Sequence, residues 1–165
     1  MNKFLTRHTP PGIEWQQEMS AFLLGQALSL LFSLGFFANY LEARSNLFEY
    51  AAGKRYLIEG AQIADFHGMT RIWFLGFGMM VFYLLGLILH HYLYYRRGSM
   101  SIYLMKRLPN RRERHRRALM VPCLSILATA ATALTLRFLY FAVYLLATPK
   151  VCLPDEVWQQ LWRIF

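Results

Sequence analysis

Few residues of this chain have the types and the spacing that catalysis requires. The sequence holds no Gly-x-x-x-x-Gly-Lys-Ser/Thr phosphate loop, no Gly-x-Ser-x-Gly nucleophile turn and no His-Glu-x-x-His zinc motif. The adjacent histidines His90 and His91 suggest a metal or haem site, but neighbouring residues on a helix point about 100° apart and cannot share one ligand face. We interpret them as part of an aromatic belt at a membrane interface. The sequence therefore predicts no catalytic residue, no metal site and no cofactor held by this chain.

The other titratable and thiol side chains form no constellation either. Asp65 and His67 fall in a polar segment outside the apolar runs, so a proton relay would have no carboxylate within a membrane to use. Cys123 and Cys152 lack metal-ligand spacing. We expect a small buried thiol at Cys123 and a free or partner-linked thiol at Cys152.

Arg137 is the one Lys, Arg, Asp or Glu within the apolar runs of the chain. Intramembrane arginine is rare, and it is usually paired or faces a polar cavity. Two interpretations stay open, because the depth of the residue decides between them. Arg137 either extends its side chain to nearby lipid headgroups or pairs with a carboxylate of the outer segment or of a partner.

The apolar residues, which make up 56% of the chain, gather into three runs at 21–41, 72–95 and 118–147. A membrane-spanning helix needs about 20 predominantly apolar residues, so each run is long enough to cross a bilayer. The last run, with about 30 residues, must tilt, kink or project, and Pro122 is the predicted kink. The sequence thus predicts an all-α integral membrane protein with three transmembrane helices.

The basic residues are as unevenly distributed as the apolar ones. The chain has a formal net charge of +9, and the segment 96–117 contains nine Lys or Arg and one Glu, whereas 42–71 has four basic and four acidic residues. Cytoplasmic loops of membrane proteins carry the excess of Lys and Arg. We therefore expect 96–117 and the interfacial N-terminal segment 1–20 to be cytoplasmic. The segment 42–71 and the C-terminal tail 148–165 should lie on the opposite, extracytoplasmic side.

Two amphipathic helices are predicted outside the apolar runs. Apolar residues between 47 and 58 indicate a short helix that lies on the membrane or on a partner. In the tail, a helix should begin near Pro154 and Asp155. Its apolar face would consist of Trp158, Leu161, Trp162 and Phe165.

Small residues recur at helical spacing in two of the runs. They are Gly25, Ser29 and Ser33 in the first run, and Ser125, Thr129 and Ala133 in the third. Stripes of this kind let helix backbones approach closely in lipid. Three spans are also few for a complete transport pathway. We therefore expect a homo- or hetero-oligomer, formed with another membrane subunit or with a second copy of the chain.

The basic segment has a pattern of its own. Residues 99–107 predict a short helix, which Pro109 ends. Asn110 and Glu113 form a variant of the capping box, which starts a second, arginine-rich helix leading into the third run. The apolar side of the first helix consists of Ile102, Met105 and Tyr103.

The run GSMSIYLMKRLPNRRERHRR (98–117) resembles the inner loop of exporter-type ABC transporter permeases, where a short helix precedes a Leu-Pro turn and the next span. It is more similar to small three-span membrane proteins of Gram-positive bacteria that are associated with ABC transporters. Their loop reads Ser-x-Ser-x-Tyr-Leu-Met-x-Arg-Leu-Pro-x-Arg-x-Glu. The close match covers about 20 of 165 residues, and the arginine density is higher here than in the larger permeases. The matching residues are Ser99, Ser101, Tyr103, Leu104, Met105, Arg107, Leu108, Pro109 and Glu113.

The resemblance implies a permease-like or accessory subunit of an ABC-type transporter in a bacterial cell membrane, with ATP bound by a separate ATPase subunit. The residues implied to dock on that subunit are Ile102, Tyr103, Met105, Arg107, Leu108, Pro109, Arg112 and Glu113. The alternative is a membrane scaffold that does not transport, whose basic segment binds anionic lipid or an acidic cytoplasmic partner. Nucleic acid is a poor candidate partner, because no base-stacking platform accompanies the charge.

Overall fold

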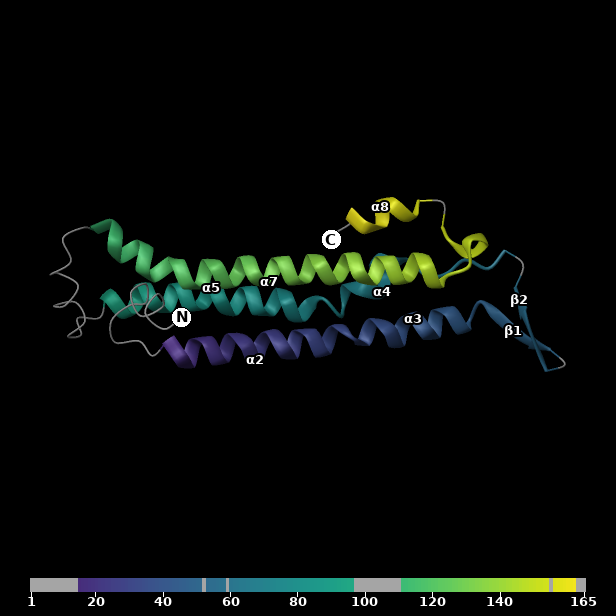
Figure 1. The fold of residues 1–165 in the computed structure, drawn as a ribbon, viewed down its shortest axis with the longest axis horizontal. Helices are drawn as coiled ribbons and strands as arrows, with labels where there is room; N and C mark the ends of the chain where they lie inside the picture. Colours follow the sequence, from purple (N-terminus) through teal and green to yellow (C-terminus); the bar gives the residue numbers. More distant parts are fainter. Residues whose placement is uncertain (1–14, 52, 59, 97–110, 155, 163–165) are drawn as a thin grey trace. The chain divides into compact units, whose positions relative to one another are not determined.

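The computed structural model describes residues 15–51, 53–58, 60–96, 111–154 and 156–162 (Figure 1). Most of these residues are helical. Three stretches are long and apolar enough to cross a membrane, namely Gln16–Ser45, Leu75–Leu93 and Leu119–Ala147. The prediction of a mostly helical chain with three helical stretches of membrane-spanning length and composition is therefore confirmed.

The first stretch consists of two consecutive helices, α2 (Trp15–Ser33) and α3 (Gly35–Ser45). Around Leu34, between them, the backbone tightens. The Leu34 amide donates to the Leu31 carbonyl, and the Phe37 amide donates to the Leu34 carbonyl. These bonds reach back three residues instead of the four of an α-helix. The first apolar run thus forms a helical stretch with a local break, and the helices extend beyond both ends of the run.

The second stretch lies in α5 (Leu75–Arg96), which follows a short helix, α4 (Phe66–Arg71). Asp65 caps α4, because its Oδ2 accepts a hydrogen bond from the Gly68 amide at 3.3 Å. The Thr70 hydroxyl donates back to the Phe66 carbonyl at 2.9 Å. The residues just before the second apolar run therefore form a separate, capped turn of helix.

The third stretch lies in α7, which runs without interruption through 37 residues, Arg111–Ala147. The predicted arginine-rich helix that leads into the third run is present from Arg111, the first residue described after 97–110. The predicted capping residue Asn110 lies outside the described residues. Pro122 sits inside the helix, where it removes one backbone donor and favours a bend. Figure 1 shows the first turns of α7 inclined to the turns that follow.

The prediction of an amphipathic helix between residues 47 and 58 is wrong. Strands β1 (Phe48–Ala51) and β2 (Lys54–Leu57) form an antiparallel hairpin there. Gly53 has a φ of 74°, a left-handed conformation that suits a tight turn and that other residues adopt at a cost. Aromatic residues alternate along β1, at Phe48 and Tyr50, a pattern that fits a pleated sheet at least as well as a helix. Apolar spacing over so short a segment does not distinguish the two.

The described chain divides into two compact units, each with its own interior. The first unit joins the chain up to Leu28 with Phe77–Ala131, and the second joins Ser29–Gly76 with Thr132–Phe165. In the first unit, a β-carbon added at Gly25 would lie 2.7 Å from the Met80 sulfur. Gly25 therefore permits a close approach of α2 and α5 that a larger residue would prevent.

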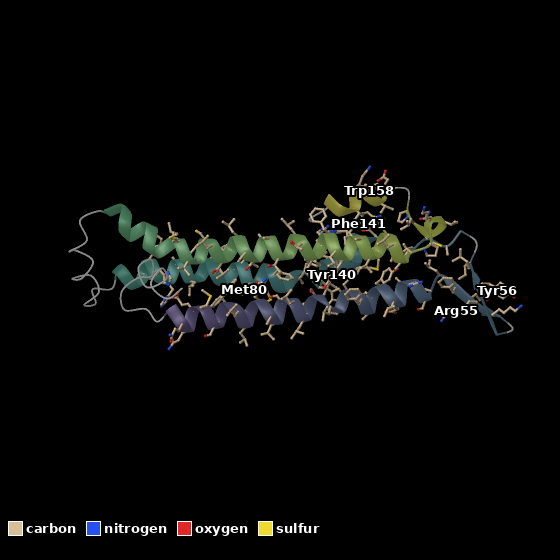
Figure 2. The ribbon with its side chains drawn as sticks, in the orientation of Figure 1. Arg55, Tyr56, Met80, Tyr140, Phe141 and Trp158 are labelled. Atoms are coloured by element: carbon tan, nitrogen blue, oxygen red, sulfur yellow. The ribbon has the colours of Figure 1, made fainter. Side chains whose placement is uncertain are left out.

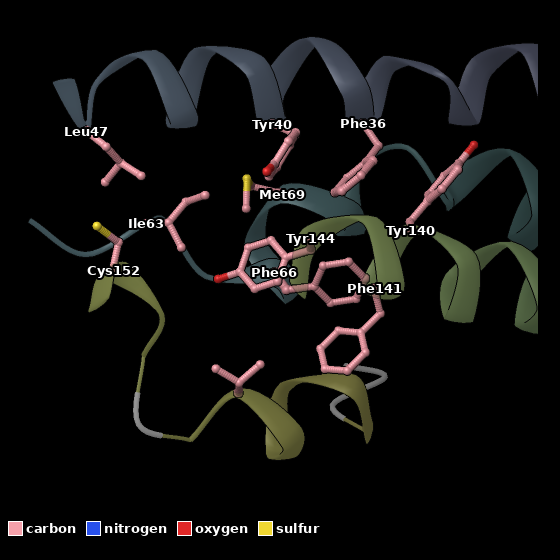
Figure 3. Close-up of a cluster of buried hydrophobic side chains, with 11 residues drawn as sticks. Phe36, Tyr40, Leu47, Ile63, Phe66, Met69, Tyr140, Phe141, Tyr144 and Cys152 are labelled. Atoms are coloured by element: carbon pink, nitrogen blue, oxygen red, sulfur yellow. The ribbon is translucent and has the colours of Figure 1, made fainter. Parts of the chain in front are cut away.

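An aromatic cluster forms the interior of the second unit (Figure 3). The Phe36 and Tyr140 rings are stacked, with centroids 4.9 Å apart and planes 6° apart. The Phe66 ring meets Phe141 edge-on at 5.2 Å. Such pairs add about 0.5–1.5 kcal/mol beyond the burial of their surface. The buried members are Phe36, Tyr40, Leu47, Ile63, Phe66, Met69, Tyr140, Phe141, Tyr144, Cys152 and Val157.

Each of the three tyrosines in this cluster has a hydrogen-bond partner for its hydroxyl group. A buried hydroxyl without a partner would cost about 1–3 kcal/mol, so these bonds permit polar rings in the interior. The partners are Ser33 Oγ for Tyr140 at 2.9 Å, Thr148 Oγ1 for Tyr40 at 3.2 Å and the Ala64 carbonyl for Tyr144 at 3.2 Å.

The tail forms η1, a 3₁₀ helix (Lys150–Cys152), and α8 (Val157–Trp162). The predicted helix after Pro154 is confirmed, and the Trp158 ring of its predicted apolar face meets Phe141 edge-on at 5.6 Å. That this face lies on the membrane or on a partner stays a prediction. Val157 and Gln160 are buried, whereas Trp158 is 68% exposed (Figure 2). The buried Gln160 side chain has a hydrogen-bond partner in the second unit, because its Oε1 accepts from the Phe66 amide of α4. Phe165 and the side chains of Leu161 and Trp162 lie outside the described part.

Gly35 gives a test of this packing. A β-carbon at Gly35 would overlap the six-membered ring of Trp73, so Gly35→Ala should lower the free energy of unfolding by about 1–3 kcal/mol, despite the higher helix propensity of alanine. Gly86 in α5 has no such neighbour within 4 Å, so Gly86→Ala should be neutral or stabilising. Thermal unfolding in detergent, followed by circular dichroism, measures both. Equal stability of the two variants would contradict the packing described for Gly35.

Candidate functional site

Most of the residues predicted to dock on an ATPase lie outside the described residues. These are Ile102, Tyr103, Met105, Arg107, Leu108 and Pro109. Arg112 and Glu113 belong to the first turn of α7, and the structure describes their backbone but not their side chains. The helix that leads away from the predicted Leu-Pro turn is thus described, and the docking surface itself stays a prediction.

A buried pair of titratable side chains, Glu18 and His91, lies within the first unit. Glu18 Oε1 is 2.7 Å from His91 Nε2. The side chain of His91 is 1% exposed and that of Glu18 is 13% exposed. Glu18 Oε2 is also buried and has no hydrogen-bond partner among the residues that the structure describes. The pair joins α2 to α5 through a short polar contact that little solvent reaches.

This pair corrects the prediction for the two adjacent histidines. His91 is buried against Glu18 and does not lie in an aromatic belt, whereas His90 is exposed. Glu18 was missed because it precedes the first apolar run. One signal could have found it: Glu18 lies seven residues before Gly25, and positions seven apart share one face of a helix. The small-residue stripe and the carboxylate therefore face the same side of α2.

A second polar contact in the first unit lies between α2 and α7. The Thr129 hydroxyl is 3.2 Å from Gln26 Oε1 and 2.9 Å from the Ser125 carbonyl, and it can donate its single hydrogen to only one of them at a time. Thr129 is fully buried. The stripe of small residues in the third run thus includes a residue that packs inward and hydrogen-bonds to another helix.

Arg137 lies in the second unit, where three elements meet at its side chain. Its Nη2 donates to the Gln160 carbonyl of α8 at 3.3 Å. Its guanidinium carbon lies 5.8 Å from the centroid of the Phe66 ring in α4, a cation–π distance. Gln160 Oε1 in turn accepts from the Phe66 amide at 3.0 Å. The arginine of the third run therefore helps fasten α8 to α4 and α7, a role that neither sequence interpretation included.

The prediction of a buried thiol is wrong for Cys123, whereas Cys152 is a free cysteine, one of the two states predicted for it. Cys123 is exposed, and Cys152 is almost fully buried in the aromatic cluster. The Cys152 carbonyl accepts from the Ile63 amide at 3.0 Å, so its residue belongs to the interior of the second unit. Among the residues described, no group of three or more His, Cys, Asp or Glu side chains is placed to hold a metal ion.

The Glu18–His91 pair can be tested by removing each partner. Glu18→Leu or His91→Leu leaves one buried polar group without this partner, so each should lower the free energy of unfolding by about 1–3 kcal/mol. The double substitution removes both and should cost less than the sum of the two. Glu42→Leu, at an exposed position, is the matched control and should have little effect. Additive single effects, measured by thermal unfolding in detergent, would show that the two side chains do not interact.

Comparison with known protein families, curated proteins and solved structures gives no match for this chain, so its function has to be inferred from its residues and their geometry.

Proposed function

We propose that this chain is a three-span integral membrane protein of a bacterial cell membrane. The observation that carries the proposal is the distribution of side chains on the long helices. Large apolar residues face outward, whereas several polar ones face inward. Among the buried residues are Ser29, Ser33, His91 and Thr129.

The outward-facing apolar residues occur on all three stretches. Examples are Leu24 and Leu31 on α2, Met79 and Phe82 on α5, and Leu127 and Leu146 on α7, all of them exposed large hydrophobic side chains. Soluble monomeric proteins rarely expose contiguous apolar patches of more than a few hundred Å². A lipid environment removes this cost, because hydrocarbon chains solvate such side chains.

The charge distribution supports one orientation. The segment 96–117, which joins α5 to α7, has nine basic residues and one acid, and 42–71 is balanced. On the rule that basic loops remain inside, the N-terminus is cytoplasmic. The hairpin β1–β2 and the tail with α8 are then extracytoplasmic.

We further propose that the chain acts as the membrane subunit, permease-like or accessory, of an ABC-type transporter. The support is the run 98–117 and its resemblance to loops that contact ABC ATPases. The described helices add that α5 ends at Arg96 and α7 begins at Arg111. The short predicted helix and its Leu-Pro turn therefore connect the ends of two long helices. Closure of the ATPase on ATP would move this connection and, through it, the helices.

The second candidate function is a membrane scaffold that does not transport. The observation that favours it is the charge of 96–117 itself, since a polybasic segment beside membrane spans attracts anionic lipid. Both candidates share the membrane topology, and they differ in what the basic segment binds.

The topology is tested first. A cysteine introduced as Lys54→Cys in the hairpin should react with a membrane-impermeant thiol reagent in intact cells, and one introduced as Asn110→Cys should not. The native Cys123 and Cys152 are replaced by serine in both variants. Permeabilised cells serve as the control, in which both positions should react. The reverse pattern in intact cells would overturn the orientation and the cytoplasmic docking that depends on it.

The coupling function is tested in the basic segment. Burial of a large apolar side chain contributes about 1.5–3 kcal/mol, whereas an exposed ion pair contributes about 0–1 kcal/mol. Met105→Asp, or Ile102→Ser with Met105→Ser, should therefore weaken retention of the ATPase by about tenfold or more. Single Arg→Ala changes within 111–117 should have smaller effects. Pro109→Ala should also uncouple, because it lets the two helices fuse and rotates one relative to the other.

The measurement is co-purification of the ATPase with the membrane subunit, together with its ATPase rate. Liposome binding of the same variants distinguishes the scaffold. If the apolar changes leave both readouts unaltered while binding to anionic liposomes falls stepwise with each lost arginine, the scaffold function is correct and the transporter function is wrong.

A further inference from the structure

A cavity of about 340 Å³ lies in the second unit, between the end of α3 and the hairpin. Its lining residues are Leu41, Arg44, Ser45, Phe48 and Arg55. Leu41, Arg44 and Ser45 are three and four residues apart, so they share one face of α3. Two of the five lining side chains are arginines, one from the helix and one from β2, and none is a carboxylate.

The hairpin register explains why Arg55 reaches this cavity. Phe48 pairs with Leu57, and Tyr50 pairs with Arg55. Alternate residues of a strand point to the same face, so Phe48 and Arg55 share one face of the hairpin. Figure 2 shows Arg55 on the hairpin beside the end of α3. The end of α3 and the hairpin, which belong to the same unit, thus bring two guanidinium groups from neighbouring elements to one cavity.

Two guanidinium groups are a good match for a phosphate group. Arginine presents its N–H donors in a planar fork that binds phosphate oxygens in pairs, and these charge-assisted bonds are stronger than neutral ones. The Ser45 hydroxyl donates to the Glu42 carbonyl at 2.7 Å, so its hydrogen is already used. Each guanidinium group has five N–H donors, so Arg44 and Arg55 would hold an anion in the cavity in addition to the contact that Arg55 already makes.

The position of the cavity favours the phosphate of a lipid. The stretch long and apolar enough to span a membrane ends at Ser45, so Arg44 lies in its last turn, where arginine side chains reach headgroups. Leu41, one turn deeper, is 61% exposed, and Phe48 adds an aromatic surface. A lipid with its phosphate at the arginines would place its acyl chains along the apolar side.

We propose that this cavity binds the phosphate group of a membrane phospholipid, held by Arg44 and Arg55, with Leu41 and Phe48 contacting its apolar part. The proposal rests on the membrane topology proposed above, which puts the cavity at the extracytoplasmic leaflet. It does not depend on the transporter function. A bound lipid at this place would tie the hairpin to the end of the first span.

The test uses the full chain in a maltoside detergent, titrated with dihexanoylphosphatidylglycerol and followed by native mass spectrometry. Arg44→Gln and Arg55→Gln should each weaken lipid binding by about tenfold or more, since each removes charge-assisted hydrogen bonds. Arg44→Lys should weaken binding less than Arg44→Gln, because it keeps the charge but loses the fork. Arg71→Gln is the matched control, because Arg71 is exposed on α4 and does not line the cavity. Circular dichroism verifies that each variant keeps its helical content.

Each outcome is decisive. Equal lipid binding by the wild type and the Arg44→Gln, Arg55→Gln double variant overturns the proposal, and so does an equal loss in Arg71→Gln. If inorganic phosphate at the lipid concentration displaces the lipid, the cavity takes free phosphate and the lipid assignment is wrong. Thiol labelling at residue 54 and ATPase retention are measured on the same variants. A loss of lipid binding with both unchanged supports the lipid site separately from the proposed function.

Discussion

Polar contacts and aromatic packing, together with a few buried aliphatic side chains such as Leu84, hold the described helices together. The long helices keep most of their large aliphatic residues on the outside. In the proposed lipid environment such residues would gain nothing by turning inward, so association would depend on close packing and on interhelical hydrogen bonds. The interior shows both kinds of contact. The absence of a side chain at Gly25 leaves room for Met80. Polar contacts join α2 to α5 at Glu18 and α2 to α7 at Gln26.

In the second unit, aromatic rings make most of the contacts between helices. Its helices meet through stacked and edge-on rings whose hydroxyl groups are all paired. Arg137 and Gln160 extend this arrangement to the tail, since α8 is held by a guanidinium donor on one side and a backbone amide on the other. A helix of six residues could not persist on its own propensity, so tertiary contacts maintain it.

The proposed function assigns different roles to the segment that joins α5 to α7 and to the segments on the proposed extracytoplasmic side. The basic segment joins α5 to α7 on the proposed cytoplasmic side, where a soluble ATPase could reach it. The Glu18–His91 contact lies on the same helix, α5, one turn and a half before its last residue, Arg96. A movement of the basic segment would therefore act on a helix that a buried polar pair anchors to α2. The hairpin and α8 belong to the second unit, and in the proposed orientation they are extracytoplasmic.

The sequence by itself determined what depends on local composition and spacing. Three apolar runs specify three long helices, because length and hydropathy are properties of each run alone. The start of α8 shortly after Pro154 also follows from local sequence, because proline favours the first turn of a helix. The uneven charge also predicts an orientation, because the positive-inside rule depends only on the charge of each loop.

Only the tertiary structure decided which polar residues are buried and what they contact. Glu18 meets His91 across 73 residues of sequence, and Tyr140 meets Ser33 across 107. Helical periodicity identifies a face but not the partner that covers it, so the sequence does not predict that Cys123 is exposed and Cys152 is buried. The hairpin was mistaken for a helix because its pairing is made between strands, whereas its apolar spacing fits either period. Whether a side chain is buried depends on the other segments that pack against it, so the sequence of one segment does not determine it.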